Sequence, residues 1–173
     1  MSAKRDADAA VTALYDAHYR PLVALAALLV TDAGLAEDVV QDSFVALHRG
    51  WRLLGREGPG DDQALSYLRR CVVNRSRAAQ RRGVLRSVRA PGHEPAPGQR
   101  PAPGQGGPAA LAALHALPPR QREVLALQHY AGLSASQTAR MLGTSTTAVQ
   151  RHTARAMASL RTVLDPRAGG NVP

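Results

Sequence analysis

The chain has 173 residues and a formal net charge of +9, with 22 Lys and Arg residues against 13 Asp and Glu residues. This length suffices for one ordinary domain or two small ones. Aromatic residues are scarce, whereas Ala and Leu are abundant, so we expect an all-α protein. Every basic residue except Lys4 is Arg, whose planar guanidinium is well suited to phosphate and guanine.

Residue content also argues against several kinds of protein. The single cysteine, Cys71, allows no intramolecular disulfide and no cysteine-based metal site, and its apolar helical setting predicts a small buried side chain. The longest apolar run, residues 22–30, is far shorter than the ~20 residues of a membrane span. The N-terminal residues form no signal-peptide pattern. These features predict a cytoplasmic protein.

The sequence does not predict an enzyme. It contains no phosphate-binding glycine motif, no metal-ligand spacing and no nucleophile elbow. The six His residues are scattered along the chain, so each is interpreted as a packing or surface residue. Glu37 and Asp38 are adjacent and therefore diverge around a helix instead of converging on one site. We expect no cofactor, no metal and no catalytic activity.

Apolar periodicity predicts three helices in the first half of the chain. The first covers about 11–29, and its predicted buried positions are Val11, Leu14, Tyr15, His18, Leu22, Leu25 and Leu29. The second covers about 35–51 and buries Leu35, Val39, Val40, Ser43, Phe44 and Leu47. After a polar loop, the third covers about 64–82 and buries Leu65, Leu68, Cys71 and Val72.

A Pro- and Gly-rich stretch divides the chain into two predicted modules. Residues 91–108 read PGHEPAPGQRPAPGQGGP, which offers almost no apolar surface to offset the entropy of ordering. We therefore expect a helical domain over 10–85, a flexible linker over 86–108 and a second helical domain over 109–164.

The second module is predicted to contain four helices with recognisable residues at their ends. The helices cover, in order, a stretch from about 109, then 120–130, then 135–142, and a last helix to about 164. The end signals are Pro119 in a first turn, Ser134 as an N-cap, Gly143 as a stop, and Thr144 or Ser145 as the next N-cap.

Within this module, residues 134–156 have the spacing of a helix-turn-helix. Ala139 is small where the two helices would cross, Gly143 lies at the turn, and Val149 is an apolar anchor in the second helix. Such a motif presents the start of its second helix to the major groove of DNA. The residues predicted to face the DNA are Thr146, Thr147, Gln150, Arg151 and Arg155. A plain helical hairpin with a solvated Arg face is the alternative.

The third predicted helix carries a second basic surface. Residues 67–89 contain eight Arg and no acidic residue. One helical face is predicted to present Arg70, Asn74, Arg77 and Arg81. The guanidinium groups suit a phosphate backbone, and the amide can pair with a base edge. A solvated charged face is an equal alternative on this segment alone. A second basic module on a tether favours DNA, because linked weak contacts reinforce one another.

The second predicted helix carries an acidic stripe in an otherwise basic chain. Its members are Glu37, Asp38, Gln41 and Asp42. A carboxylate face is poorly suited to DNA, so the stripe indicates a basic protein partner. A solvated helix face with acids near its N-terminal end would explain the same residues.

Together, these segments resemble extracytoplasmic-function sigma factors of bacterial RNA polymerase. The resemblance rests on the runs LAEDVVQDSFVALHRGW, SYLRRCVVNRSRAAQRR and LPPRQREVLALQHYAGLSASQTARMLG. Within them, AED-x-x-Q-x-x-F and LPPRQREVL are the specific strings. The resemblance covers about 10–85 and 109–164 and implies that these modules are sigma regions 2 and 4. The implied function is to bind core RNA polymerase and direct promoter-specific transcription initiation.

The resemblance also implies partners for each surface. The acidic stripe would dock on the clamp helices of the polymerase β′ subunit, with Asp38 and Gln41 at the motif positions. The third helix and the loop before it would melt and read the −10 element, with Asn74 as the characteristic amide. Region 4 would read the −35 element as duplex DNA and contact the β flap. Gln150 replaces a residue that is usually basic, so we expect a distinct −35 preference. An anti-sigma factor is a further partner that the resemblance raises.

The alternative function is that of a conventional helix-turn-helix regulator, whose first module would sense a signal or mediate dimerisation. Such a regulator binds duplex DNA by itself, whereas a sigma factor needs core polymerase for tight, specific binding. The acidic stripe and the second basic surface favour the sigma factor.

Overall fold

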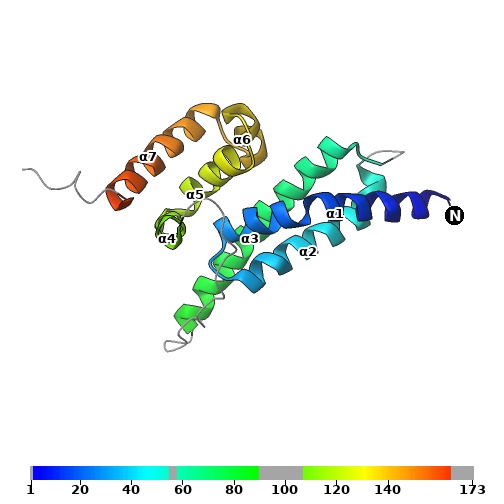
Figure 1. Cartoon of the computed structure of the whole chain (residues 1–173), viewed down its shortest axis with the longest axis horizontal. Helices are drawn as coiled ribbons and strands as arrows, with labels where there is room; N and C mark the ends of the chain where they lie inside the picture. The colour runs from blue at the N-terminus through cyan, green and yellow to red at the C-terminus, as the bar shows by residue number, and fades with distance from the viewer. Residues whose placement is uncertain (1, 55–57, 90–106, 165–173) are drawn as a thin grey trace, which may run out of the picture. The chain divides into compact units, whose positions relative to one another are not determined.

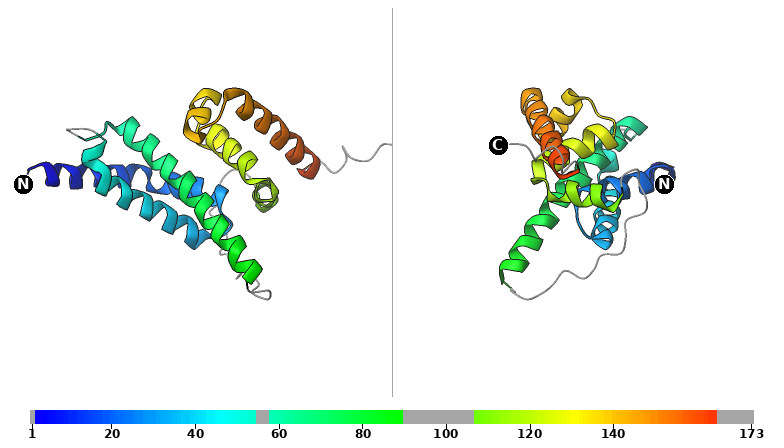
Figure 2. Two further views of the ribbon diagram at one scale, coloured as in Figure 1. Left: turned by 180° about the vertical axis from the view of Figure 1, so that it is seen from behind. Right: turned by 60° about the vertical axis from the view of Figure 1, so that its left-hand side comes forward.

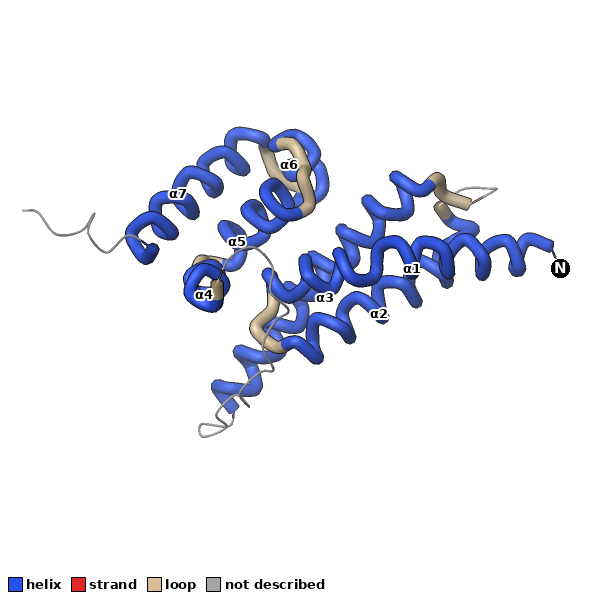
Figure 3. Tube along the Cα trace, in the orientation of Figure 1, coloured by secondary structure: helices blue, strands red, loops and turns tan. Residues whose placement is uncertain are grey.

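The computed structural model describes residues 2–54, 58–89 and 107–164. Every regular element in these ranges is helical, as Figure 3 shows, which confirms the expected all-α fold. The chain divides into two compact units, residues 1–99 and 100–173. In the described ranges no helix is long and apolar enough to cross a membrane.

The first unit is a three-helix bundle. Helix α1 (Ser2–Leu29) runs beside α2 (Ala33–Gly50), and the 3₁₀ turn η1 (Trp51–Leu53) follows α2. Helix α3 (Asp61–Arg89) packs against both and crosses them obliquely (Figures 1 and 2). The fully buried side chains at the centre include Leu25, Leu29, Val40, Leu47, Leu68 and Val72. The predicted apolar stripes therefore meet in a common core.

Helix α1 begins nine residues before its expected start at residue 11. The added segment lacks a continuous apolar stripe, so periodicity gave no signal for it. It is rich in Ala, a strong helix former. Ala7 is buried, and the Asp8 carboxylate lies 2.6 Å from the His48 ring near the end of α2. These contacts dock the start of α1 on the bundle.

The connection between α1 and α2 is held by two polar side chains. Asp32 is the N-cap of α2, and its carboxylate accepts a hydrogen bond of 2.7 Å from the Leu35 amide. Such a cap satisfies one of the amides left free in the first helical turn. The Gln80 side-chain amide, on α3, donates to the Leu29 carbonyl at the end of α1. The three helices are thus tied together at this corner.

Helix α3 continues to Arg89, past its expected end at residue 82. Residues 86–89, which we assigned to the linker, are therefore helical. Gly83 costs a helix only about 1 kcal/mol relative to Ala, which does not stop a helix already anchored in the bundle. Most of the remaining predicted linker, residues 90–106, lies outside the described residues.

The second unit contains α4 (Pro108–Ala116), α5 (Pro119–Leu125), α6 (Ala135–Leu142) and α7 (Thr146–Leu164). The end of the expected helix over 120–130 is π-helical, in the segment η2 (Ala126–Tyr130). Its wider turn is seen in the bond from the Ala131 amide to the Ala126 carbonyl. Part of the core is formed by Leu117, Leu125 and Ala156, flanked by Leu114, Met157 and Leu160. Helix α7 thereby packs against α4 and α5.

An arginine is buried beside this core. The Arg122 guanidinium donates hydrogen bonds to the carbonyls of His115, at 2.7 Å, and Leu117, at 3.1 Å. These carbonyls end α4, where no following helical turn supplies amide donors. Arg122 therefore fastens the end of α4 to α5. Burial lowers the pKa of Arg122, an effect that the neighbouring Glu123 opposes.

Candidate functional site

The predicted helix-turn-helix is formed by α6 and α7. Ser134 caps α6 in a capping box with Gln137, and Gly143 ends it in the left-handed conformation at φ +64°. Ser145 caps α7, because its hydroxyl accepts a hydrogen bond of 3.1 Å from the Ala148 amide. The expected turn residues are therefore confirmed, with Ser145 as the cap that the sequence left open.

The buried side of this motif holds α7 in place. Val149 is fully buried and Ala139 nearly so, as expected for the anchor and the crossing point. The Thr153 hydroxyl lies 2.6 Å from the Gln128 amide oxygen in η2 and 3.0 Å from the Val149 carbonyl. Thr138 is fully buried on α6. Polar side chains therefore share this interior with apolar ones.

The opposite side of α7 is open to solvent. The five residues predicted to face DNA are all exposed, and they are Thr146, Thr147, Gln150, Arg151 and Arg155. They lie within the first half of the helix, the part that such motifs present to the major groove. Their contacts with DNA remain a prediction.

The basic strip predicted on the third helix lies on α3. Arg70, Asn74 and Arg81 are exposed, and Arg77 is half-buried. The neighbouring Arg69 differs, because burial lowers the pKa of its guanidinium against the opposing effect of Asp62. The four predicted residues thus share one accessible helix face, and their role at DNA remains a prediction.

The acidic stripe lies on α2, and all four of its residues are exposed. Asp42 is not isolated there, because its carboxylate lies 3.7 Å from the Arg75 guanidinium on α3. The two residues line a shallow groove of about 230 Å³ between α2 and α3. The other lining residues are Leu35, Asp38, Val39, Ala78 and Arg82. One flank of the stripe is therefore basic.

The other flank of the stripe is aromatic, which the sequence did not indicate. Tyr15 was expected in the core but is 38% exposed. Its ring stacks on Tyr19 with centroids 4.5 Å apart and meets Phe44 of α2 edge-on at 5.0 Å. The pKa of Tyr15 is raised, first by desolvation, then by Tyr19, and then by the negative charges of Glu37 and Asp16. Apolar periodicity places Tyr15 on the α2 side of α1, but the ring lies at the edge of that contact.

Cys71 is half-buried instead of fully buried. Burial raises the pKa of its thiol, while Tyr67, Arg75 and Arg70 act in the opposite direction. A thiol with a raised pKa is a poor nucleophile at neutral pH. This agrees with a packing role for Cys71.

Comparison with protein families places two known regions on the two units. Residues 14–84 match Sigma-70 region 2, and residues 109–160 match Sigma-70, region 4. The first match spans α2, most of α1 and most of α3. The second spans α4 to α6 and most of α7.

Individual proteins give the same result. The chain is 32% identical over 141 residues to an RNA polymerase sigma-E factor of Streptomyces antibioticus, covering 80% of this chain and 76% of the relative. It is 31% identical over 141 residues, with the same coverage, to the RNA polymerase sigma-E factor of Streptomyces avermitilis.

Two solved structures share the fold. The sigma factor RpoE from Bartonella quintana, in complex with the anti-sigma factor NepR, matches with a TM-score of 0.72 and 21% identity over 87% of this chain and 93% of that one. CnrH, in complex with the cytosolic domain of CnrY, matches with a TM-score of 0.65 and 25% identity over 95% of both chains. The sequence relatives and both family regions show that this chain belongs to the extracytoplasmic-function group of sigma-70 factors, the non-catalytic subunits that bind core RNA polymerase and promoter DNA to direct transcription initiation.

Proposed function

We propose that this sigma factor divides its work between a polymerase- and −10-binding domain over 10–85 and a −35-binding domain over 109–164, joined by the segment between α3 and α4. The observation that carries this proposal is the separation of charge within the first unit. Helix α2 exposes an acidic stripe, whereas α3 exposes an arginine strip. Polymerase and DNA would therefore meet different helices of one small bundle.

The first half of α7 would read the −35 element in duplex DNA. Gln150 and Arg151 are exposed there and can each form paired hydrogen bonds, with adenine and guanine respectively. Thr146, Thr147 and Arg155 would hold the backbone and set the register of the helix. Support comes from the capped, anchored geometry of α6 and α7, which leaves these side chains accessible.

The arginine strip of α3 would bind the −10 region. Arg70, Arg77 and Arg81 suit phosphate groups, and the Asn74 amide suits a base edge. Melted DNA exposes base edges that a side-chain amide can pair with. This assignment rests on the resemblance to the family and on the shared helix face.

The acidic stripe of α2 would bind the β′ clamp helices of core polymerase, while the second domain would contact the β flap. Asp38 and Gln41 occupy the positions of the family motif, with Glu37 and Asp42 beside them. All four side chains are exposed, so a basic protein surface can reach them without any change in the bundle.

Two further assignments follow from the relatives. A protein that binds core polymerase works where transcription takes place, and we propose a cytoplasmic location. The RpoE structure holds an anti-sigma factor, and we propose that a protein of that kind controls this chain too. Competition between that protein and core polymerase for the sigma factor would test the second point.

The central test is assembly with bacterial core RNA polymerase, followed by transcription from a promoter library. We expect a stable complex that initiates at promoters sharing a −35 and a −10 sequence. Asp38→Ala with Gln41→Ala should weaken the complex and leave the affinity of the protein for −35 duplex unchanged. Loss of DNA binding in that variant, with polymerase binding intact, would refute the division of surfaces.

A further inference from the structure

An exposed valine interrupts the polar surface of α2. Val45 is 47% exposed and lies one helical turn beyond Gln41 and two beyond Asp38. Arg49 follows one turn later, so Val45 stands within the same ridge as the acidic stripe. A valine side chain forms no hydrogen bonds with water. Clusters of exposed apolar side chains therefore often mark interaction surfaces.

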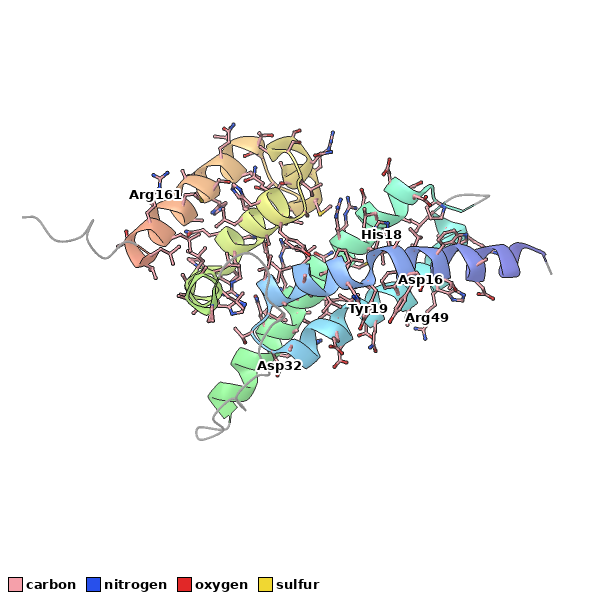
Figure 4. All side chains as sticks on the ribbon, viewed as in Figure 1. Asp16, His18, Tyr19, Asp32, Arg49 and Arg161 are labelled. Atoms are coloured by element: carbon pink, nitrogen blue, oxygen red, sulfur yellow. The ribbon has the colours of Figure 1, made fainter. Side chains whose placement is uncertain are left out.

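A tyrosine pair on α1 contacts the side of α2 that faces α1. Phe44, the neighbour of Val45 in sequence, is nearly buried and receives the edge of the Tyr15 ring. Tyr15 in turn stacks on Tyr19, one turn further along α1. Figure 4 labels Tyr19 on α1 and Arg49 on α2. We call Tyr15, Tyr19 and Val45 the Tyr–Val patch.

The tyrosine end of the Tyr–Val patch carries negative charges, whereas Arg49 lies one turn beyond Val45. Glu37 on α2 and Asp16 on α1 are close enough to raise the pKa of Tyr15. On the far side of the ridge, in contrast, Asp42 is already paired with Arg75.

We propose that the Tyr–Val patch is the energetic centre of the surface that binds core RNA polymerase, and that it receives an arginine-bearing helical surface of the polymerase. This inference rests on the proposed function of the acidic stripe and extends that site onto α1. An arginine side chain fits the tyrosines and carboxylates of this surface. A guanidinium can lie over a tyrosine face while Glu37 or Asp16 accepts its hydrogen bonds.

Interfaces of this composition have a characteristic distribution of energy. Aromatic side chains near the centre of an interface usually carry most of the binding energy, while charged rim residues mainly affect encounter rates and salt dependence. Tyr15 and Val45 should therefore matter more for affinity than Asp42. The loss caused by their removal should also depend less on salt than the loss caused by removing a carboxylate.

The test measures the dissociation constant of the full-length protein with bacterial core polymerase at low and high salt. We expect Tyr15→Ala and Val45→Ser each to weaken binding about tenfold at both salt concentrations. Asp38→Asn should weaken it mainly at low salt. Tyr15→Phe keeps the ring and should retain most of the affinity.

Leu53 provides the matched control. It is 90% exposed and apolar but lies on η1, beyond the end of α2, so Leu53→Ser should leave polymerase binding unchanged. Trp51, the single tryptophan, reports whether the first unit of each variant is folded. If Tyr15→Ala does not fold, Val45→Ser tests the inference, because Val45 is more exposed than Tyr15 and contributes less to the packing of the bundle.

Three outcomes would overturn the inference. Wild-type affinity in both patch variants, with weakened binding in Asp38→Asn, would reject the patch and keep the acidic stripe as the polymerase site. Loss of binding in Leu53→Ser to the same degree would show that the effect is not specific to the patch. Concentration-dependent dimers that Val45→Ser abolishes would assign the patch to self-association. Failure of the wild-type protein to bind polymerase would instead refute the proposed function itself.

Discussion

Asp42 on α2 and Arg75 on α3 form an ion pair of 3.7 Å between the acidic stripe and the helix that carries the arginine strip. The side chains remain 69% and 39% exposed respectively. An exposed pair of this kind contributes about 0–1 kcal/mol to stability. Its importance therefore lies in function, because Asp42 also belongs to the acidic stripe that we propose to bind core polymerase.

Breaking this pair from the Arg75 side should strengthen polymerase binding. In Arg75→Gln, Asp42 no longer has to give up an internal partner, so we expect affinity for core polymerase to rise about twofold to threefold at low salt. The free energy of unfolding should change by less than about 1 kcal/mol. Titration of labelled protein with polymerase, without DNA, and urea denaturation give the two values. A weakened complex would show that Arg75 itself contacts polymerase.

Replacing Arg122 should destabilise the second unit. Arg122→Met removes the donors to the His115 and Leu117 carbonyls, and the bond to Leu117 is buried. Because an unmade buried hydrogen bond costs about 1–3 kcal/mol, we expect a loss of that size in the free energy of unfolding of that unit. Urea denaturation monitored by circular dichroism measures this change in the free energy of unfolding.

Trp51 supplies the internal control for the Arg122 variant. It is the single tryptophan and lies in the first unit, so its emission reports only on that unit. We expect its unfolding transition to stay in place while the circular dichroism transition broadens or moves. A shift of both transitions would mean that the two units unfold together.

Sequence patterns predicted the local features of this fold well. Ser134 and Gly143 were identified as helix ends because a cap or a left-handed residue acts on its own turn, without help from distant parts of the chain. The family resemblance rests on short runs of the same kind and was confirmed by the comparisons. The alternative of a conventional regulator is thereby excluded.

Features that depend on packing between helices were not predictable in this way. Periodicity places Tyr15 on the inner side of α1, but only the position of α2 decides that its ring stays at the edge. Arg122 reads as a surface charge until the carbonyls at the end of α4 are placed beside it. Helix α3 passes Gly83 because its earlier turns are anchored in the bundle.

The glycine at the turn of the helix-turn-helix should be needed for its backbone conformation alone. Gly143 has φ +64°, and a Cβ placed there would meet no atom within 4 Å. Gly143→Ala should therefore cost about 1–2 kcal/mol, the strain of a left-handed residue with a side chain. Gly143→Asn should cost less, because Asn tolerates this region. Thermal unfolding compares the two, and equal losses would point to a contact instead of strain.

Arg151 should contribute to the sequence preference of −35 recognition. If its guanidinium pairs with a base, Arg151→Ala in the polymerase complex should cost about 1–3 kcal/mol on the preferred −35 sequence and little on sequences altered at the contacted base pair. Competition binding across a set of −35 variants measures this difference. Arg161 is the matched control, an exposed arginine ten residues later on the same helix (Figure 4).

The control separates base reading from general electrostatics. Ten residues along α7 correspond to about 15 Å, so Arg161 lies well beyond the half of the helix proposed to enter the groove. Arg161→Ala should therefore leave the ranking of −35 sequences unchanged. A uniform loss across all sequences in Arg151→Ala would make Arg151 a phosphate contact, because the backbone is the same in every sequence. Base recognition would then fall to Gln150, whose amide favours adenine.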